Sequence, residues 1–247
     1  MANENPTWGE ERIASELLLK LAIRISARTV RRNMPRGKGP QRGPSSQYWM
    51  TFVRNHAQAI LASDFVVTIT VNFRVLYVFV ILEVGTRRIA HFNVTAHPTA
   101  EWTLQQFREV ITGENSYQFL IHDRDSIYSF EFDACLKSMG LGILKTPFRA
   151  PQANAFCERL IGSIRRECLD FLIPLNERHL RKILKEWVAH YNKGRPRSSL
   201  GPGIPEPSEG TPAAQLSSHR ILCDHRVARK PVLGGLHHDY RLEMVAA

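Results

Sequence analysis

The chain is poor in cysteine, and its few cysteines are irregularly spaced. Only four occur in 247 residues, and no signal peptide precedes them. Such a set implies no disulfide framework and favours reduced thiols in a cytosolic compartment. We therefore expect a cytoplasmic protein. The four residues are Cys135, Cys157, Cys168 and Cys223.

Long hydrophobic runs are also absent. The longest, around Val75 to Val84, contains Glu83 and is too short to span a bilayer. It therefore predicts a buried strand, and we expect no membrane association. The hydrophobic fraction of 43% excludes disorder throughout and suits one sizeable domain with a small appendage.

Acidic residues are the minority charge. The chain carries 33 lysines and arginines against 23 aspartates and glutamates, which gives a net charge of +10 at pH 7. The isoelectric point is near 9.8. A basic balance of this kind points to polyanionic partners, above all nucleic acid.

The first 46 residues predict a helix-turn-helix. Apolar residues recur at helical spacing from Glu11 to Leu21, and a second helix is expected to begin with Ser26 as its N-cap and Val30 facing inward. Such a helix can enter the major groove of DNA while its arginines neutralise phosphates, and a solvated basic helix pair is the alternative. The arginines expected to point outward are Arg28, Arg31 and Arg32.

A basic linker follows these helices. Residues 35–46 read PRGKGPQRGPSS, and seven basic residues but no acidic one occur from Arg24 to Arg42. We therefore expect a DNA-binding segment with its linker at 1–46, a folded core at 47–201 and a tail of unknown role at 202–247.

The core begins with strands and continues with alternating helices and strands. After a helix expected at 48–59, three strand-like runs with short connections favour antiparallel hairpins. The order predicts an α/β fold, a mixed sheet flanked by helices, after a small helical segment. The strands are expected at 61–70, 75–84 and 87–94, then helix 99–111, strand 117–121, helix 130–139, strand 141–144 and further helices.

Three acidic residues stand in unusual places. Asp64 lies in the apolar run that starts at Ala59, Asp123 follows the sequence FLIH, and Glu158 lies in an apparent helix. An ionised carboxylate in such surroundings loses hydration unless a cation or a donor replaces the water. Acids at strand ends can converge on one sheet edge, and a surface or salt-bridged carboxylate is the alternative for each acid alone.

The helix around Glu158 has two different sides. Asn154, Glu158 and Arg165 are spaced by four and seven residues, which places them on one helical face, while the apolar residues point elsewhere. Carboxylates of this kind can bind two Mg²⁺ or Mn²⁺ ions at a phosphodiester. Arg165 then suits a DNA phosphate, and Asn154 a backbone or base contact.

Several motifs resemble the DDE integrase and transposase superfamily. They are FVVTITV after Asp64, HDRDSIY around Asp123, APQANAFCERLIGSIRRE around Glu158, and the closing HYNKGRPRSSLG. The opening NPTWGEERIASELL with ISARTV resembles the helix-turn-helix region of bacterial insertion-sequence transposases. The resemblance implies a ribonuclease-H-like core and a bacterial, nucleoid-associated enzyme that integrates and recombines DNA with Mg²⁺ or Mn²⁺, assembled as a homo-oligomer on transposon ends and target.

Carried over by position, the catalytic and metal-binding acids are Asp64, Asp123 and Glu158, and the basic residue seven positions later is Arg165. The 34 residues between Asp123 and Glu158 are close to the spacing of the superfamily's signature. One departure is that Asp125 replaces the usual Gly, so Asp125 competes with Asp123 as a ligand. We prefer Asp123.

Two further hypotheses stay open. The fold also suits a nuclease or resolvase that only hydrolyses DNA, and a short segment before the helix-turn-helix is consistent with a truncated or inactive DNA-binding copy. Among other candidates, His122 is expected to be packed or solvated rather than ligating, and His97 with Pro98 and Thr99 to form a turn and N-cap. A zinc site lacks paired spacing in the set His219, Cys223, His225, His237 and His238. In helix 177–192, Leu180, Leu184, Trp187 and Tyr191 predict core, and Arg178, Arg181, Lys182 and Lys185 a wet face.

Overall fold

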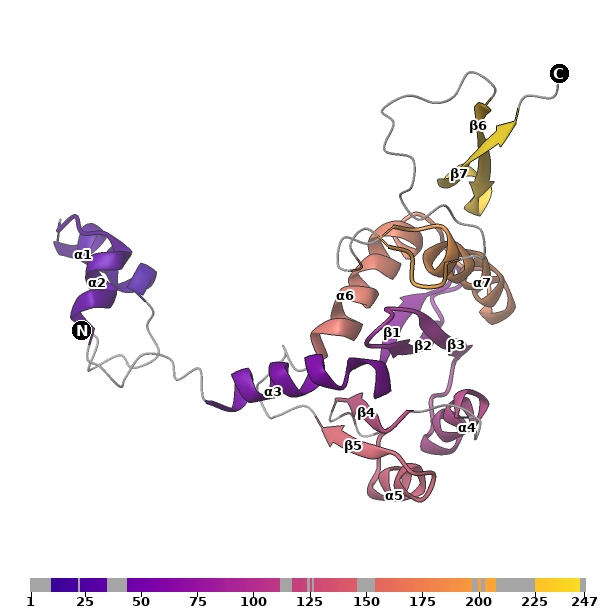
Figure 1. Ribbon diagram of the computed structural model, residues 1–247, viewed down its shortest axis with the longest axis horizontal. Coiled ribbons are helices and arrows are strands. Elements are labelled where there is room, and N and C mark those ends of the chain that lie inside the picture. Colours follow the sequence, from indigo (N-terminus) through magenta and orange to yellow (C-terminus); the bar gives the residue numbers. More distant parts are fainter. Residues whose placement is uncertain are drawn as a thin grey trace. The chain divides into compact units, whose positions relative to one another are not determined.

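The computed structural model describes residues 10–21, 23–34, 44–111, 117–123, 125, 127–145, 154–196, 200, 203–207 and 225–244. The chain divides into two compact units, Met1–Asn55 and His56–Ala247. Figure 1 shows the elements of each.

The first unit contains three helices, α1 (Glu10–Leu21), α2 (Ala27–Asn33) and α3 (Pro44–Asn55). Helix α2 begins as expected, because the Ser26 hydroxyl accepts the Thr29 amide at 3.2 Å. Ile13 of α1 and Val30 of α2 are buried, and the two helices contact each other. The predicted pair of helices with an apolar interior is therefore present.

A five-stranded mixed sheet organises the second unit. Its order is β3-β2-β1-β4-β5. Strands β1 to β3 are antiparallel, whereas β4 is parallel to β1 and β5 is parallel to β4. The strands are β1 (Ile60–Ile69), β2 (Val75–Glu83), β3 (Ile89–Thr95), β4 (Phe119–His122) and β5 (Gly142–Lys145). The strands predicted in the core are all found, within a few residues of their expected bounds.

Helices cover both faces of this sheet. Helices α4 (Ala100–Val110) and α5 (Phe130–Ser138) lie on one side, and α6 (Ala155–Ile164) and α7 (Glu177–Lys193) on the other (Figure 1). The first layer buries apolar side chains of alternate strand positions. The strand residues of this layer include Leu61, Phe79, Ile81 and Leu120, and they pack against Phe107 of α4 and Phe132 and Leu136 of α5.

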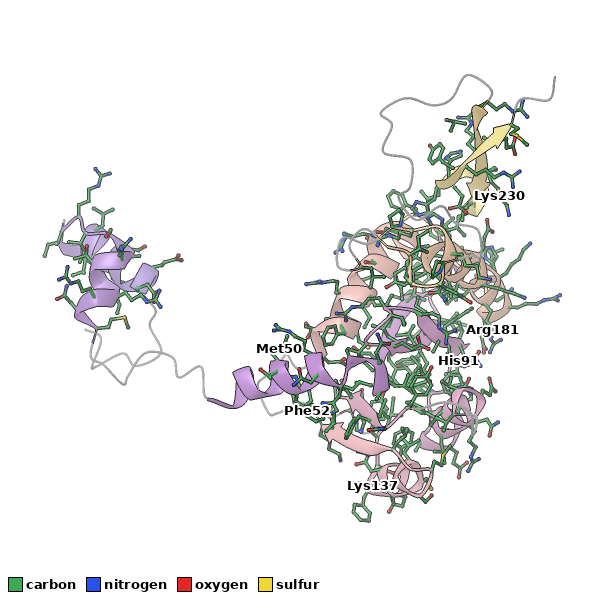
Figure 2. The ribbon with its side chains drawn as sticks, in the orientation of Figure 1. Met50, Phe52, His91, Lys137, Arg181 and Lys230 are labelled. Carbon is green, nitrogen blue, oxygen red and sulfur yellow. The ribbon has the colours of Figure 1, made fainter. Side chains whose placement is uncertain are left out.

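The other face of the sheet carries Asp64 and is covered by α6 and α7. Leu180, Leu184, Trp187 and Tyr191 of α7 are buried, which confirms the expected core face of that helix. Arg181 is exposed, as predicted, and it also contacts β3. Its guanidinium donates to Asn93 Oδ1 at 3.0 Å and to the Val94 carbonyl, so it fastens α7 to β3; Figure 2 shows Arg181 on α7 and His91 on β3.

Helix α6 ends in a π-helical turn, η3 (Arg165–Leu169), that the helical periodicity did not predict. The tail then forms a hairpin of β6 (His225–Val232) and β7 (His237–Met244), joined by the short 3-10 helix η5 (Leu233–Gly235). Gly234 and Gly235 have φ values of 66° and 100°, which glycine adopts without a steric penalty. This hairpin was not predicted, and it packs against α7.

Candidate active site

The parallel pairing of β1 with β4 places Asp64 and Asp123 at the same level of the sheet. Ile60 pairs with Phe119, and Ala62 pairs with Ile121. Asp64 lies two residues beyond Ala62, and Asp123 lies two residues beyond Ile121, so the same offset sets the two aspartates side by side. Asp123 directly follows β4, at the carboxyl end of a strand, where ligand sites of α/β sheets commonly lie.

Helix α6 is attached to β1 on both sides of Asp64. The buried side-chain amide of Asn154 donates to the Ser63 carbonyl at 3.3 Å. The exposed guanidinium of Arg165 donates to the Val67 carbonyl at 3.4 Å. The predicted face of Asn154, Glu158 and Arg165 therefore lies over the strand that carries Asp64, with the exposed Glu158 between the two anchors in sequence.

The electrostatics of Asp64 show that the acids act on one another. Burial raises the pKa of Asp64 to about 7, although the Phe65 amide, which donates to Asp64 Oδ1 at 2.8 Å, opposes this effect. The negative charges of Asp123, Glu158 and Asp125, in that order, make smaller contributions to the same rise to about 7 in the pKa of Asp64. The site therefore concentrates negative charge that a bound cation would stabilise.

Asp123 and Asp125 each organise the loop that follows them. Asp123 Oδ1 accepts the Asp125 amide, and Asp125 Oδ1 accepts the Ile127 amide, both at 3.1 Å. These are turn contacts of the kind that aspartate makes locally. Asp125 is exposed and its effect on Asp64 comes after those of Asp123 and Glu158.

His122 is buried, so of the two expected alternatives to metal ligation, packed or solvated, the structure shows the packed one. Its Nδ1 lies 2.6 Å from the Asp123 carbonyl oxygen, and its Nε2 lies 3.1 Å from Asp133 Oδ1. Lys145 Nζ pairs with Asp133 Oδ2 at 2.5 Å. Burial lowers the pKa of His122, against the raising effect of the Asp123 carbonyl and of Asp133. His122, at the end of β4, thus links the main chain at Asp123 to Asp133 of α5.

Sequence reasoning missed three residues next to these acids. Asp133, in the first turn of α5, is the buried partner of His122, and no local sequence signal pairs these two residues. Tyr128 is buried, and its hydroxyl lies 3.4 Å from Ser63 Oγ. Burial raises the pKa values of Tyr128 and Cys157 well above their usual range, and Asp64 and Asp123 add to this effect.

The donor set suits a hard divalent cation in kind. Asp64, Asp123 and Glu158 offer only carboxylate oxygens, which Mg²⁺ and Mn²⁺ prefer. In the described part of the chain, no three or more His, Cys, Asp or Glu side chains stand close enough together to hold a metal ion. The acids therefore share one electrostatic field without forming a closed ligand cluster.

The remaining candidates are placed as follows. Arg28, Arg31 and Arg32 have exposed side chains on α2. Thr99 forms the predicted N-cap, accepting the Trp102 amide at 3.1 Å. Among the suggested zinc ligands, His219 and Cys223 lie outside the described residues, and His237 Nε2 lies 2.6 Å from the Glu167 carbonyl oxygen. The described residues include no helix long and apolar enough to cross a membrane.

Residues 140–205 match the family model described as "Integrase core domain". This segment contains Glu158, Arg165, α6 and α7. The resemblance to the integrase and transposase superfamily is confirmed. No curated protein sequence matches the chain.

Solved structures of this superfamily share the fold. A chain of the simian T-cell lymphotropic virus intasome, in complex with the PP2A regulatory subunit B56 gamma, aligns with a TM-score of 0.51 at 12% identity, over 74% of this chain and 66% of that one. The Mos1 transposase catalytic domain, solved with raltegravir and Mg, aligns with a TM-score of 0.50 at 13% identity, over 58% of this chain and 78% of that one. The present chain thus has the ribonuclease-H-like core of integrases, and it spans about two thirds of the intasome chain.

Proposed function

We propose that the chain is a DDE-type polynucleotidyl transferase that cleaves DNA and joins the strands, using Asp64, Asp123 and Glu158. The observation that carries the proposal is geometric: the pairing of β1 with β4 sets Asp64 level with Asp123, and α6, which bears Glu158, is bonded to β1 on both sides of Asp64. These acids come from β1, from the end of β4 and from α6. The integrase core match at residues 140–205 supports the same assignment.

Asp64, Asp123 and Glu158 are the residues that would hold Mg²⁺ or Mn²⁺, and these ions supply activation of an attacking hydroxyl and stabilisation of a leaving oxygen at a phosphodiester. The chain itself keeps the carboxylates in place. The β1–β4 register sets Asp64 beside Asp123, and Asn154 fixes the start of α6 on Ser63. His122 holds the Asp123 carbonyl through one ring nitrogen.

The basic residues are proposed to bind DNA. Arg165 stands at the end of the helical face that carries Glu158 and is exposed, so it can reach a phosphate beside the scissile bond. Arg28, Arg31 and Arg32 of α2 would contact phosphates or bases of a transposon end. Asn154 is buried on Ser63, so a DNA contact by Asn154 requires that this bond open. A cytoplasmic, nucleoid-associated homo-oligomer on DNA is part of the proposal.

The test uses labelled duplex DNA carrying candidate ends, with Mg²⁺ or Mn²⁺. Glu158→Gln and Asp64→Asn should each lower strand transfer by about 100-fold or more, since even outer-shell changes at metal sites cost 10–100-fold. DNA retention, measured by gel shift, should stay the same. Glu131→Gln is the matched control, because Glu131 is an exposed acid on α5.

The products separate the competing functions. Joined strands require a transferase, whereas cleaved but unjoined strands identify a nuclease or resolvase. DNA binding with no cleavage in either metal identifies an inactive copy. Strand transfer that survives Glu158→Gln rejects the assignment of that residue.

A further inference from the structure

The C-terminal hairpin is fastened to the core at several points. The His190 ring of α7 stacks on the His237 ring of β7, with centroids 5.3 Å apart and planes 12° apart. His190 Nδ1 pairs with Asp239 Oδ1 at 2.5 Å, and the Leu233 amide donates to Glu186 Oε1 at 2.5 Å. Other hairpin side chains point outward, including Arg226, Tyr240 and Arg241, and Figure 2 shows Lys230 on this element.

A further contact of the hairpin reaches the end of the helix that carries Glu158. His237 Nε2 donates to the Glu167 carbonyl oxygen at 2.6 Å. In an uninterrupted α-helix this carbonyl would accept the amide of Phe171, but that amide donates instead to Cys168 O at 3.2 Å. The cause is the π-helical turn, in which the Asp170 amide donates to Arg165 O at 2.9 Å. His237 therefore satisfies a helix-end carbonyl from a position seventy residues away.

Glu167 is held through its side chain as well. Its carboxylate pairs with Arg195, which follows the end of α7. The π turn thus has one anchor on the hairpin and another beyond α7. Because the turn continues α6 directly, these anchors fix the end of the segment on which Glu158 and Arg165 stand.

Gly194 provides the space that this docking requires. A Cβ added at Gly194 would overlap Asp239 Oδ1, and it would lie 2.9 Å from His190 Nδ1. Any side chain here displaces the pair of His190 with Asp239. The backbone conformation does not require glycine here, since a φ of −114° is open to any residue, so the requirement is for space.

We propose that His237 is a positioning residue and that hairpin β6–β7 clamps the π turn, so that Glu158 and Arg165 keep their place over β1. This inference rests on the proposed function. It assigns a role to the tail: the hairpin sets the geometry of the active-site helix from outside the site. Loss of the clamp should lower the rate of the chemical step and leave the affinity for DNA unchanged.

The experiment compares the full chain with His237→Ala, His237→Gln and His238→Ala. Gln keeps an amide donor at about the reach of the imidazole Nε2, so it should restore the bond. His238 packs on Tyr240 within the hairpin and serves as the matched control. Gly194→Ala undocks the hairpin by a different route and replaces His237→Ala if that variant fails to fold.

Three readouts are combined. For His237→Ala, kcat of strand transfer should fall about tenfold with KM for DNA within about twofold, as for other outer-shell contacts. Amide exchange in residues 165–171 should be about fivefold faster. Mn²⁺ affinity should fall about tenfold. His237→Gln should recover most of each value, and His238→Ala should match the parent chain.

Several outcomes overturn the clamp. Unchanged exchange in residues 165–171 disproves the carbonyl contact, and faster exchange with unchanged kcat disproves its role in positioning. Loss of activity that only follows the folded fraction, without rescue by Gln, reduces His237 to a stabilising contact. A parent chain that is inactive on every DNA substrate contradicts the proposed function but not the clamp. Amide exchange in residues 165–171 and Mn²⁺ affinity then test whether His237 holds the π turn.

Discussion

The side chain of Asn192 completes the outer strand of the sheet at Ile89. Asn192 Oδ1 accepts the Ile89 amide and Asn192 Nδ2 donates to the Ile89 carbonyl, both at 3.0 Å. A single buried side-chain amide thus takes the place of a neighbouring strand.

Asn192→Ala should destabilise the fold. The change leaves the buried amide and carbonyl of Ile89 without partners, and each such group costs about 1–3 kcal/mol. We expect a loss of about 2–4 kcal/mol in the free energy of unfolding, measured by urea denaturation. Lys193→Ala, next to it on an exposed position, is the control and should change stability by about 0.5 kcal/mol or less. Equal midpoints for the two variants would refute this role of Asn192.

Asp125→Asn should leave strand transfer within about threefold of the parent chain, whereas Asp123→Asn should lower it about 100-fold or more. Asn at 125 still accepts the Ile127 amide, so the substitution removes charge and keeps the turn. Strand-transfer assays at saturating Mn²⁺ compare the two. Similar losses in both variants would assign Asp125 to the metal site as well.

Glu83 should make the fold sensitive to acid. Burial alone would raise its pKa, but hydrogen bonds from Arg88, Thr86 and Tyr117 outweigh burial and hold the pKa below its usual 4.5. The Arg88 and Tyr117 contacts to Glu83 Oε1 each measure 2.5 Å. Since the folded-state pKa is the lower one, the stability that Glu83 contributes is present above pH 4.5 and is lost as pH falls through the folded-state value.

Urea unfolding at a series of pH values checks this sign. Glu83→Gln should be less stable than the parent chain at pH 7, and the difference should shrink below pH 4.5. Tyr117→Phe should cost about 1–3 kcal/mol at pH 7, as for hydrogen bonds to charged groups. Glu101→Gln, an exposed acid on α4, is the control. A difference that grows on acidification would contradict the assignment.

The cysteines should react with thiol reagents in a definite order. Cys135 is exposed, while Cys157 and Cys168 are buried. Burial raises the pKa of Cys168 to about 12 and that of Cys157 well above its usual range, so both stay protonated. Among these three described cysteines, peptide mass spectrometry after iodoacetamide treatment at pH 8 should show modification of Cys135 before Cys157 and Cys168. Rapid labelling of Cys157 would show that α6 opens away from β1.

Local signals predicted most of the core. Strand alternation, short turns and the capping residues Ser26 and Thr99 act over a few residues, so they can be read from the sequence. The face of Asn154, Glu158 and Arg165 followed from helical spacing, and the structure lays it over β1. Sequence spacing could not predict that Asp64 and Asp123 lie at the same level of the sheet, because this depends on the register in which β1 pairs with β4.

Contacts between distant residues account for what was missed. The hairpin contains Pro231 within β6, which weakens a strand prediction, and its docking depends on His190 and Glu167, which lie about fifty to seventy residues away. Arg181 is exposed as its polar helical position predicts, but its bonds to the two oxygen acceptors on β3 could not be predicted from spacing. The π turn depends on packing rather than on periodicity.

The contacts of α7 with β3 also limit how copies of this chain can associate. Asn192 bonds the amide and the carbonyl of Ile89, and Arg181 bonds the carbonyl of Val94, so main-chain groups near both ends of the outer strand already have partners. A strand from another molecule finds these positions taken, which guards the edge against intermolecular sheet growth and amyloid-like pairing. Association of copies by extension of the sheet at β3 is therefore disfavoured.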